Sequence, residues 1–125
     1  MKAKTKTQAL GPLQRKWIAA LESGKFKQAK GRLFDGKGYC CLGVACVVMG
    51  EKPTDYSGDY LFLGEMENLP PKIAKSLRLR TRSGDANKLT MGFRLTELND
   101  ESSLSLEEIG GMLRALPHRY FKGPA

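Results

Sequence analysis

The fold depends on one stretch in the first half of the chain, GRLFDGKGYCCLGVACVV at residues 31–48. Its middle, Asp-Gly-Lys-Gly at residues 35–38, predicts a turn, because Asp and Gly adopt turn conformations at little cost. The short runs at residues 31–34 and 39–42 flank this turn and predict two paired strands. The stretch therefore predicts an antiparallel hairpin that spans Gly31 to Leu42.

Helical signals lie on both sides of this hairpin. Residues 44–49 are typical of a short buried helix, although their three valines leave a strand open as the alternative. Three further helices are expected: one opened by Pro12, one opened by Pro70-Pro71, and one capped by Ser105 and ended by Pro117.

The sequence predicts a single small α+β domain, in which three or four short helices pack on a small antiparallel sheet built around the 31–42 hairpin. The length of 125 residues fits one domain and suffices for a hydrophobic core without disulfides or a metal. We place this domain at residues 11–117. It is expected to lie between a flexible basic tail at residues 1–10 and a C-terminal tail at residues 118–125.

The apolar runs and the cysteines bear on where the protein works. The longest apolar run, Val44–Met49, is far shorter than the roughly 20 residues that cross a bilayer, so we expect no membrane partner. The basic start of the chain is not followed by the apolar segment of a secretory signal. The odd number of cysteines, three, favours reduced thiols over a disulfide framework. We therefore expect a cytoplasmic location.

The charge is concentrated in two blocks. The chain has 21 basic and 13 acidic side chains, a formal net charge of +8. Residues 1–48 carry ten basic and two acidic side chains, and residues 70–96 carry seven basic and one acidic. If the fold brings these blocks to one face, they form an electrostatic surface for phosphates. The alternative is a solvated basic surface with no ligand, since charge predicts solubility as readily as binding.

Three arginines with alternate spacing, Arg78, Arg80 and Arg82, suggest how such a surface is built. In an extended segment their guanidinium groups project on one side, which suits bidentate contacts to phosphates. Tyr39 and Tyr120 would stack on bases beside them. The predicted anion-binding residues are Arg32, Lys37, Arg78, Arg80, Arg82 and Lys88.

The three cysteines allow three interpretations. A zinc site would have to combine them with His118, the only histidine, and adjacent cysteines chelate poorly on a strand. A nucleophile would be Cys41, at the start of a helix, where the pKa of a thiol can be lowered. We favour a buried apolar role, because free cysteine is among the most buried residue types. The predicted structural core includes Trp17, Cys40, Cys41, Cys46, Leu98 and Ile109. No catalytic residue, metal or cofactor is predicted.

Asn99 and Asp100 precede the capped helix and allow two interpretations. They would either form a polar site for a ligand or metal, or bond the local backbone at a helix end, as Asn and Asp side chains commonly do. We favour the local role.

Several short motifs occur in order: Trp17–Gly24, Gly31-Arg32-Leu33, Tyr39–Cys46, Leu69-Pro70, Leu89-Thr90, Leu95–Asp100 and Glu108-Ile109. This pattern resembles a family of small proteins that is widespread in tailed bacteriophages and prophages. The resemblance runs from residue 13 to residue 116, and Cys-Cys-Leu-Gly-Val is its most specific part. Family members often carry an acidic residue after the last cysteine, where this chain has Val47. The resemblance implies a phage or prophage accessory protein and implies no particular reaction.

These observations predict a non-catalytic phage accessory protein, for host takeover or against host defence, in the cytoplasm of the host cell. It would bind nucleic acid or a nucleotide signal through a basic face. The first alternative is a protein-interaction inhibitor of a host enzyme or defence complex. The second is a cysteine-dependent enzyme.

Overall fold

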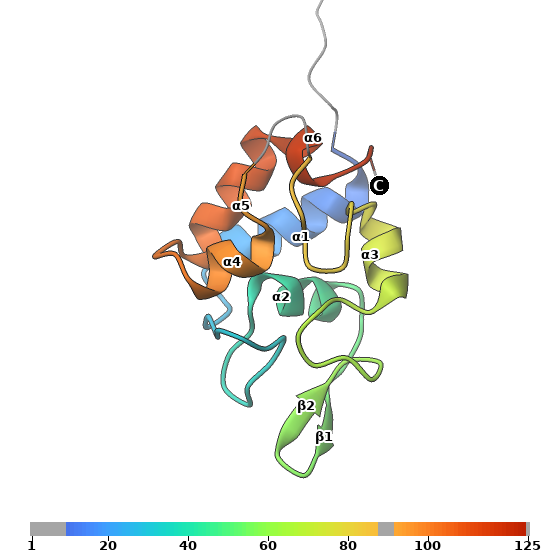
Figure 1. Ribbon diagram of the computed structural model, residues 1–125, viewed down its shortest axis with the longest axis vertical. Coiled ribbons are helices and arrows are strands. Elements are labelled where there is room, and N and C mark those ends of the chain that lie inside the picture. Colours follow the sequence, from blue (N-terminus) through green and yellow to red (C-terminus); the bar gives the residue numbers. More distant parts are fainter. Residues whose placement is uncertain (1–9, 88–91, 125) are drawn as a thin grey trace, which may run out of the picture.

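The computed structural model describes residues 10–87 and 92–124. Within those residues the chain forms six helices and one two-stranded antiparallel sheet, which confirms a small single-domain α+β fold (Figure 1). The helices are α1 (Pro12–Glu22), α2 (Cys41–Val48), α3 (Pro71–Leu77), α4 (Leu95–Asp100), α5 (Leu106–Ala115) and α6 (Pro117–Tyr120), and the strands are β1 (Thr54–Tyr56) and β2 (Asp59–Leu61). The helices outnumber the three or four predicted, because the short α4 and α6 were not expected.

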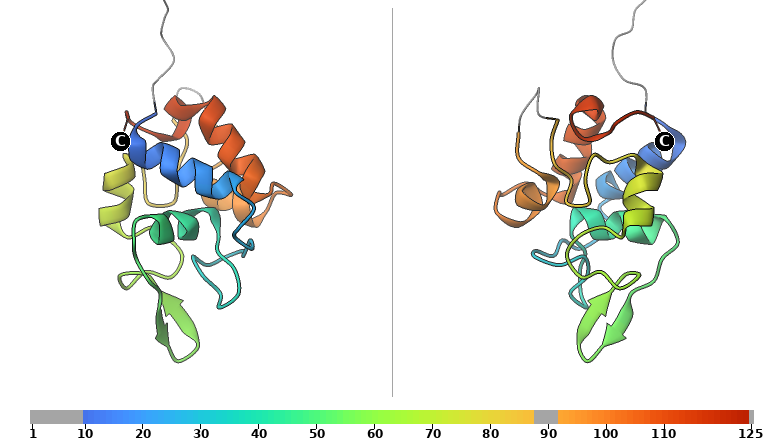
Figure 2. Two further views of the ribbon diagram at one scale, coloured as in Figure 1. Left: turned by 180° about the vertical axis from the view of Figure 1, so that it is seen from behind. Right: turned by 45° about the vertical axis from the view of Figure 1, so that its right-hand side comes forward.

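The helices enclose one hydrophobic core. The helix α1 crosses α5 and also packs on α2 (Figure 2). Gly110 lets α1 and α5 approach closely, since a Cβ at this position would lie 3.1 Å from the Leu21 Cβ. The Trp17 ring is buried, and its Nε1 donates a hydrogen bond to the Cys41 carbonyl at 3.0 Å. The structure buries Trp17, Cys40, Cys41, Cys46, Leu98 and Ile109, the six side chains assigned to the core from the sequence.

The predicted hairpin at residues 31–42 does not form the sheet. Its turn is present, because the Asp35 carboxylate accepts hydrogen bonds from two backbone N–H groups of the turn, at 2.9 and 2.8 Å. The two flanking segments pair across this turn only through one isolated bridge, between Phe34 and Tyr39. The Tyr39 backbone also bonds to residues 27–29, through its N–H at 2.7 Å and its carbonyl at 2.9 Å. The pairing ends there because Cys40 is already the N-cap of α2, which begins at Cys41.

The second predicted strand is replaced by the start of α2. This helix begins at Cys41, three residues before the predicted start, and its extent confirms the helical interpretation of the valine segment. The Cys40 Sγ accepts a hydrogen bond from the Gly43 N–H as the N-cap. Gly43 takes a helical conformation. It lies inside the helix, so close to the Leu33 carbonyl that a Cβ would be 1.9 Å from that oxygen.

The sheet lies in the polar segment that follows α2. The strands β1 and β2 pair with Thr54 opposite Leu61, and Ser57 and Gly58 form the turn between them. Both turn residues have a positive φ, 54° and 91°, which matches the twist of a tight hairpin. The hairpin projects away from the helices (Figure 1), and its Tyr56 side chain is 71% exposed.

The prediction of a C-terminal tail at residues 118–125 is wrong for the residues that the structure describes. Tyr120 ends α6 and is 1% exposed, and Phe121 is fully buried. Phe121 pairs with Leu79 in an isolated bridge, which brings the C-terminal segment back to the end of α3. The predicted N-terminal tail, except Leu10, lies outside the described residues.

Within residues 10–87 and 92–124, no helix is long and apolar enough to cross a bilayer.

Candidate anion-binding site

A cavity of about 640 Å³ opens between the C-terminal end of α3 and the C-terminal segment. Its lining includes five cationic side chains, Lys75, Arg78, Arg80, Arg82 and Lys122, and we call it the basic groove. Three of the six predicted anion-binding residues, the alternate arginines, meet here. The structure adds two lysines that were not predicted, one from α3 and one from the C-terminal segment.

The basic groove is built where two distant segments meet. Arg78 follows α3 in a left-handed conformation, with φ of 57°. The Lys122 N–H donates a hydrogen bond to the Arg78 carbonyl at 2.7 Å, which places the two residues side by side. The buried Gln14 fixes this junction, because its Nε2 donates to the Leu77 carbonyl at 3.0 Å and to the Gly123 carbonyl at 2.7 Å.

Two of the alternate arginines are occupied by contacts within the protein. Arg80 donates through Nη2 to the carbonyls of His118 and Phe121, at 2.8 and 3.2 Å, and so holds the C-terminal segment. Arg82 donates through Nε to the Leu69 carbonyl at 2.8 Å, and its Nη2 forms an ion pair with Glu65 at 2.5 Å. These guanidinium groups keep only part of their donor capacity for a ligand.

Lys75, Arg78 and Lys122 are different, and we call them the cationic triad. All three are exposed and line the basic groove. Among the residues that the structure describes, none of their charged groups lies within 4.0 Å of a carboxylate. The triad is therefore the part of the basic groove whose charge no described carboxylate compensates.

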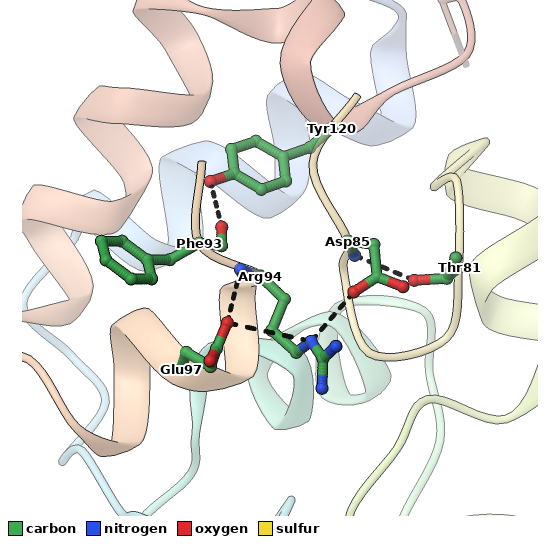
Figure 3. Close-up of polar contacts among 6 residues, drawn as sticks. All are labelled: Thr81, Asp85, Phe93, Arg94, Glu97 and Tyr120. Atoms are coloured by element: carbon green, nitrogen blue, oxygen red, sulfur yellow. Dashed lines mark hydrogen bonds and ion pairs between the residues drawn. The ribbon is translucent and has the colours of Figure 1, made fainter. Parts of the chain in front are cut away.

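The loop that carries Arg80 and Arg82 into the groove is fixed at its far end (Figure 3). The Asp85 N–H donates to Thr81 Oγ1 at 2.9 Å, and the Asp85 carboxylate pairs with Arg94 Nε at 2.9 Å. The loop thus has bonds both to itself and to the start of α4.

Two of the remaining predicted cations, Arg32 and Lys37, do not line the groove. Arg32 forms an ion pair with Asp59 at 2.6 Å and lines a separate cavity of about 310 Å³. The exposed Lys37 lies in the turn at residues 35–38, away from the residues that line the groove. Lys88 falls outside the described residues.

The two predicted stacking residues differ in exposure. The Tyr120 ring is buried, and its hydroxyl donates to the Phe93 carbonyl at 2.6 Å (Figure 3). Its predicted stacking on a base is therefore wrong. The Tyr39 ring is half-buried and stacks on Phe34 with ring centroids 4.5 Å apart, and its stacking on a base stays a prediction.

The cysteines are placed as apolar groups of the core. Burial raises the pKa of Cys40 and of Cys46 to about 12 and raises the pKa of Cys41 well above its ordinary value. Such thiols are protonated at neutral pH and are poor nucleophiles. Within the described part of the chain, no group of three or more His, Cys, Asp or Glu side chains could hold a metal ion.

Asn99 has a larger structural role than a local turn. Its side chain is fully buried, and its Oδ1 accepts hydrogen bonds from the Cys41 N–H at 3.1 Å and from Gln28 Nε2 at 3.0 Å. Its Nδ2 donates to the Ala29 carbonyl at 2.7 Å and to the neighbouring Asp100 at 2.8 Å. The residue joins α4 to α2 and to the preceding loop. The long sequence separation of these partners explains why local reasoning missed them.

The chain belongs to a family defined by a domain of unknown function, DUF8296, which matches residues 11–115. No curated protein and no solved structure matches the chain. The matched region contains Lys75 and Arg78 of the cationic triad, and Lys122 lies beyond it.

Proposed function

We propose that the protein is a non-catalytic accessory protein of a tailed phage or prophage, and that it binds an anionic ligand, nucleic acid or a nucleotide, in the basic groove. One observation carries the binding proposal: Lys75, Arg78 and Lys122 line one cavity, and none of them is paired with a carboxylate of the described chain.

The charges of the triad favour an anion for a physical reason. Lys75, in the last turn of α3, and Arg78, directly after this helix, line the same cavity, and like charges held close together repel each other. A phosphate between them removes that repulsion. Arg78 would bind its oxygens in a bidentate manner, and the lysines would add point charges.

The wall of the basic groove strengthens such an interaction. Ala74 and Leu79 line it beside the cations, and both side chains are largely buried. Apolar atoms displace water from one side of a bound phosphate, which lowers the effective dielectric constant around each ion pair.

The phage setting rests on the motif pattern that includes Tyr39–Cys46 and Leu95–Asp100. In that setting, a protein that binds nucleotides without chemistry would act by sequestering a host signal or by occupying host nucleic acid. The raised pKa values of the three cysteines support a non-catalytic role over a thiol enzyme.

The test is a binding titration at about 0.1 M salt, where electrostatic contacts remain measurable. Labelled single-stranded DNA, RNA and cyclic nucleotides are each followed by fluorescence anisotropy. We expect at least one to bind, and we expect Lys75→Ala, Arg78→Ala and Lys122→Ala each to weaken it. The matched control is Lys72→Ala, on the same helix and exposed but outside the groove lining. If Lys72→Ala and Lys75→Ala lost the same affinity, the binding would depend on overall charge and not on the groove. If none of the ligands bound, the proposal would be wrong.

A second candidate function, inhibition of a host protein by contact, is favoured by the β1–β2 hairpin. It projects from the helices (Figure 2) and carries Tyr56 at 71% exposure, with Leu63 at 52% just after it. Large apolar side chains that a fold leaves exposed are a feature of interaction surfaces. Nuclease-resistant capture of one host protein that Tyr56→Thr abolishes and Arg78→Ala preserves would support this candidate over the first.

A further inference from the structure

We infer that the basic groove selects the closely spaced phosphates of a small polyphosphate, such as a nucleoside triphosphate end, and binds them without Mg²⁺. The inference rests on the anion-binding function proposed above and names its ligand class. Three observations support it. The unpaired charges of the groove lie in one cluster, its described lining has no aromatic or acidic side chain, and the nearby Glu65 is paired with Arg82.

The free charges form a cluster and not a track. Lys75 lies in the last turn of α3, Arg78 directly follows this helix, and the Lys122 N–H donates to the Arg78 carbonyl at 2.7 Å; all three residues line the groove. All three side chains therefore start from one patch of surface. Proteins that follow a nucleic-acid strand need contacts spread along its phosphates. A cluster of this kind suits several negative charges on adjacent phosphorus atoms.

The described residues of the groove offer no platform for bases. No aromatic side chain of residues 10–87 or 92–124 lines it, and the two tyrosines considered from the sequence, Tyr39 and Tyr120, are engaged in packing. Proteins that bind single strands without sequence preference gain much of their affinity from base stacking on aromatic rings. A ligand of this groove must gain its affinity from phosphates instead.

The described lining of the groove also offers no carboxylate to a metal ion. No Asp or Glu side chain among the described residues lines it, and the nearby Glu65 is already paired with Arg82 at 2.5 Å. Mg²⁺ sites in nucleotide-binding proteins use one or two carboxylates together with the phosphates. Here the cationic triad takes the place of the metal, so Mg²⁺ in solution would compete with the triad for the same phosphate oxygens.

Isothermal titration calorimetry of the full chain tests the inference with inorganic tripolyphosphate, pyrophosphate and orthophosphate. We expect tripolyphosphate to bind about tenfold or more tightly than orthophosphate, because the Coulomb energy grows with each added charge. Arg78→Ala should weaken the affinity for tripolyphosphate by about tenfold, whereas Lys72→Ala should change this affinity by less than about twofold. Excess Mg²⁺ should weaken binding in the unmodified protein.

A competition experiment separates this inference from the proposed function. A labelled oligothymidylate is bound first, and tripolyphosphate is added; displacement supports the inference. A contrary outcome is that Arg78→Ala abolishes oligothymidylate binding while tripolyphosphate neither binds nor displaces the oligonucleotide. In that case the groove binds nucleic-acid strands, so the inferred ligand class is wrong and the proposed anion-binding function stands. Stronger tripolyphosphate binding with Mg²⁺ would overturn the metal-free mode. If no anion binds at all, both proposals fall.

Discussion

Arg78 has both a strained backbone conformation and a guanidinium group that pairs with no described carboxylate. Its φ of 57° is left-handed, a conformation that costs an L-residue roughly 1–2 kcal/mol relative to glycine. The position is fixed from both sides, because its N–H bonds to the Lys75 carbonyl at 3.1 Å and its carbonyl accepts from Lys122 at 2.7 Å. The backbone at this position thus favours glycine, whereas the proposed function needs the guanidinium group.

Replacing Arg78 should therefore separate stability from binding. We expect Arg78→Gly to raise the free energy of unfolding by up to about 1 kcal/mol, since the strain is relieved, and to lose anion binding. Arg78→Ala keeps the strain, so it should lose binding without the gain in stability. Urea unfolding and the anisotropy titration measure the two quantities. A variant Arg78→Gly that keeps full affinity would remove Arg78 from the site.

Gly43 marks the closest approach between a helix and a loop. A Cβ there would lie 1.9 Å from the Leu33 carbonyl oxygen and 2.8 Å from its carbon, and these are backbone atoms that cannot rotate away. We expect Gly43→Ala to destabilise the fold by about 3 kcal/mol or more. Gly111→Ala is the matched control, because nothing lies within 4 Å of its Cβ position in α5. It should stabilise by about 0.5–1 kcal/mol in urea unfolding, as an alanine does in a helix.

At the scale of elements, helices with strong local signals could be predicted from the sequence. Pro12 and Pro71 stand at the starts of α1 and α3. The capping box of α5 forms as expected, with the Ser105 N–H bonded to Glu108 at 2.8 Å and the Glu108 N–H bonded to the Ser105 hydroxyl at 3.1 Å. In each case the deciding contacts lie within one turn of chain, so no tertiary information is needed.

The elements that depend on distant partners could not be predicted. The turn at residues 35–38 predicts the 31–42 hairpin, but its second strand stops at Cys40, which caps α2. The true hairpin, β1–β2, has an exposed first strand and only half-buried residues in the second. It therefore lacks the alternation of buried and exposed residues that marks a strand. The burial of Phe121 likewise depends on Leu79, far away in sequence.

The contacts of Asn99 hold three elements together, and their loss should be severe. Asn99→Asp replaces the Nδ2 donor with an oxygen that would face the Ala29 carbonyl and the Asp100 carboxylate. It also buries a charge, so we expect a loss of about 3 kcal/mol or more in urea unfolding at neutral pH. Asn68→Asp, an exposed residue, introduces the same charge and should change stability by no more than about 0.5 kcal/mol. Equal effects of the two would contradict the central role of Asn99.

At the scale of the whole molecule, the two basic blocks do not meet in the groove. The groove draws four of its five cations from the block at residues 70–96 and the fifth, Lys122, from beyond both blocks. Arg32, from the first block, is instead paired with Asp59 at 2.6 Å. Charge and spacing in the sequence predict the three arginines of the groove. They do not predict that Arg80 and Arg82 donate hydrogen bonds to backbone carbonyls. Lys122 could not be found, because its place depends on the fold of the C-terminal segment.

The buried cysteines make the free energy of unfolding of the whole molecule fall at alkaline pH. Burial raises the pKa of Cys40 and Cys46 to about 12 in the folded state, against an ordinary value of 9.0. The folded protein thus holds these protons more tightly than the unfolded chain does. The stability that results is fully present below about pH 9 and is lost as the pH rises from 9 toward 12.

We therefore expect the urea midpoint to fall steadily above about pH 9, and Cys46→Ala to make this fall shallower because one buried thiol is gone. The same burial predicts that iodoacetamide modifies none of the three thiols in the folded protein at neutral pH and all of them in urea. Cys46→Ala also carries a small cavity, so the slope with pH is the diagnostic quantity, not the midpoint at one pH. A native thiol that reacts as fast as a free cysteine would contradict the burial argument and reopen the case for a thiol nucleophile.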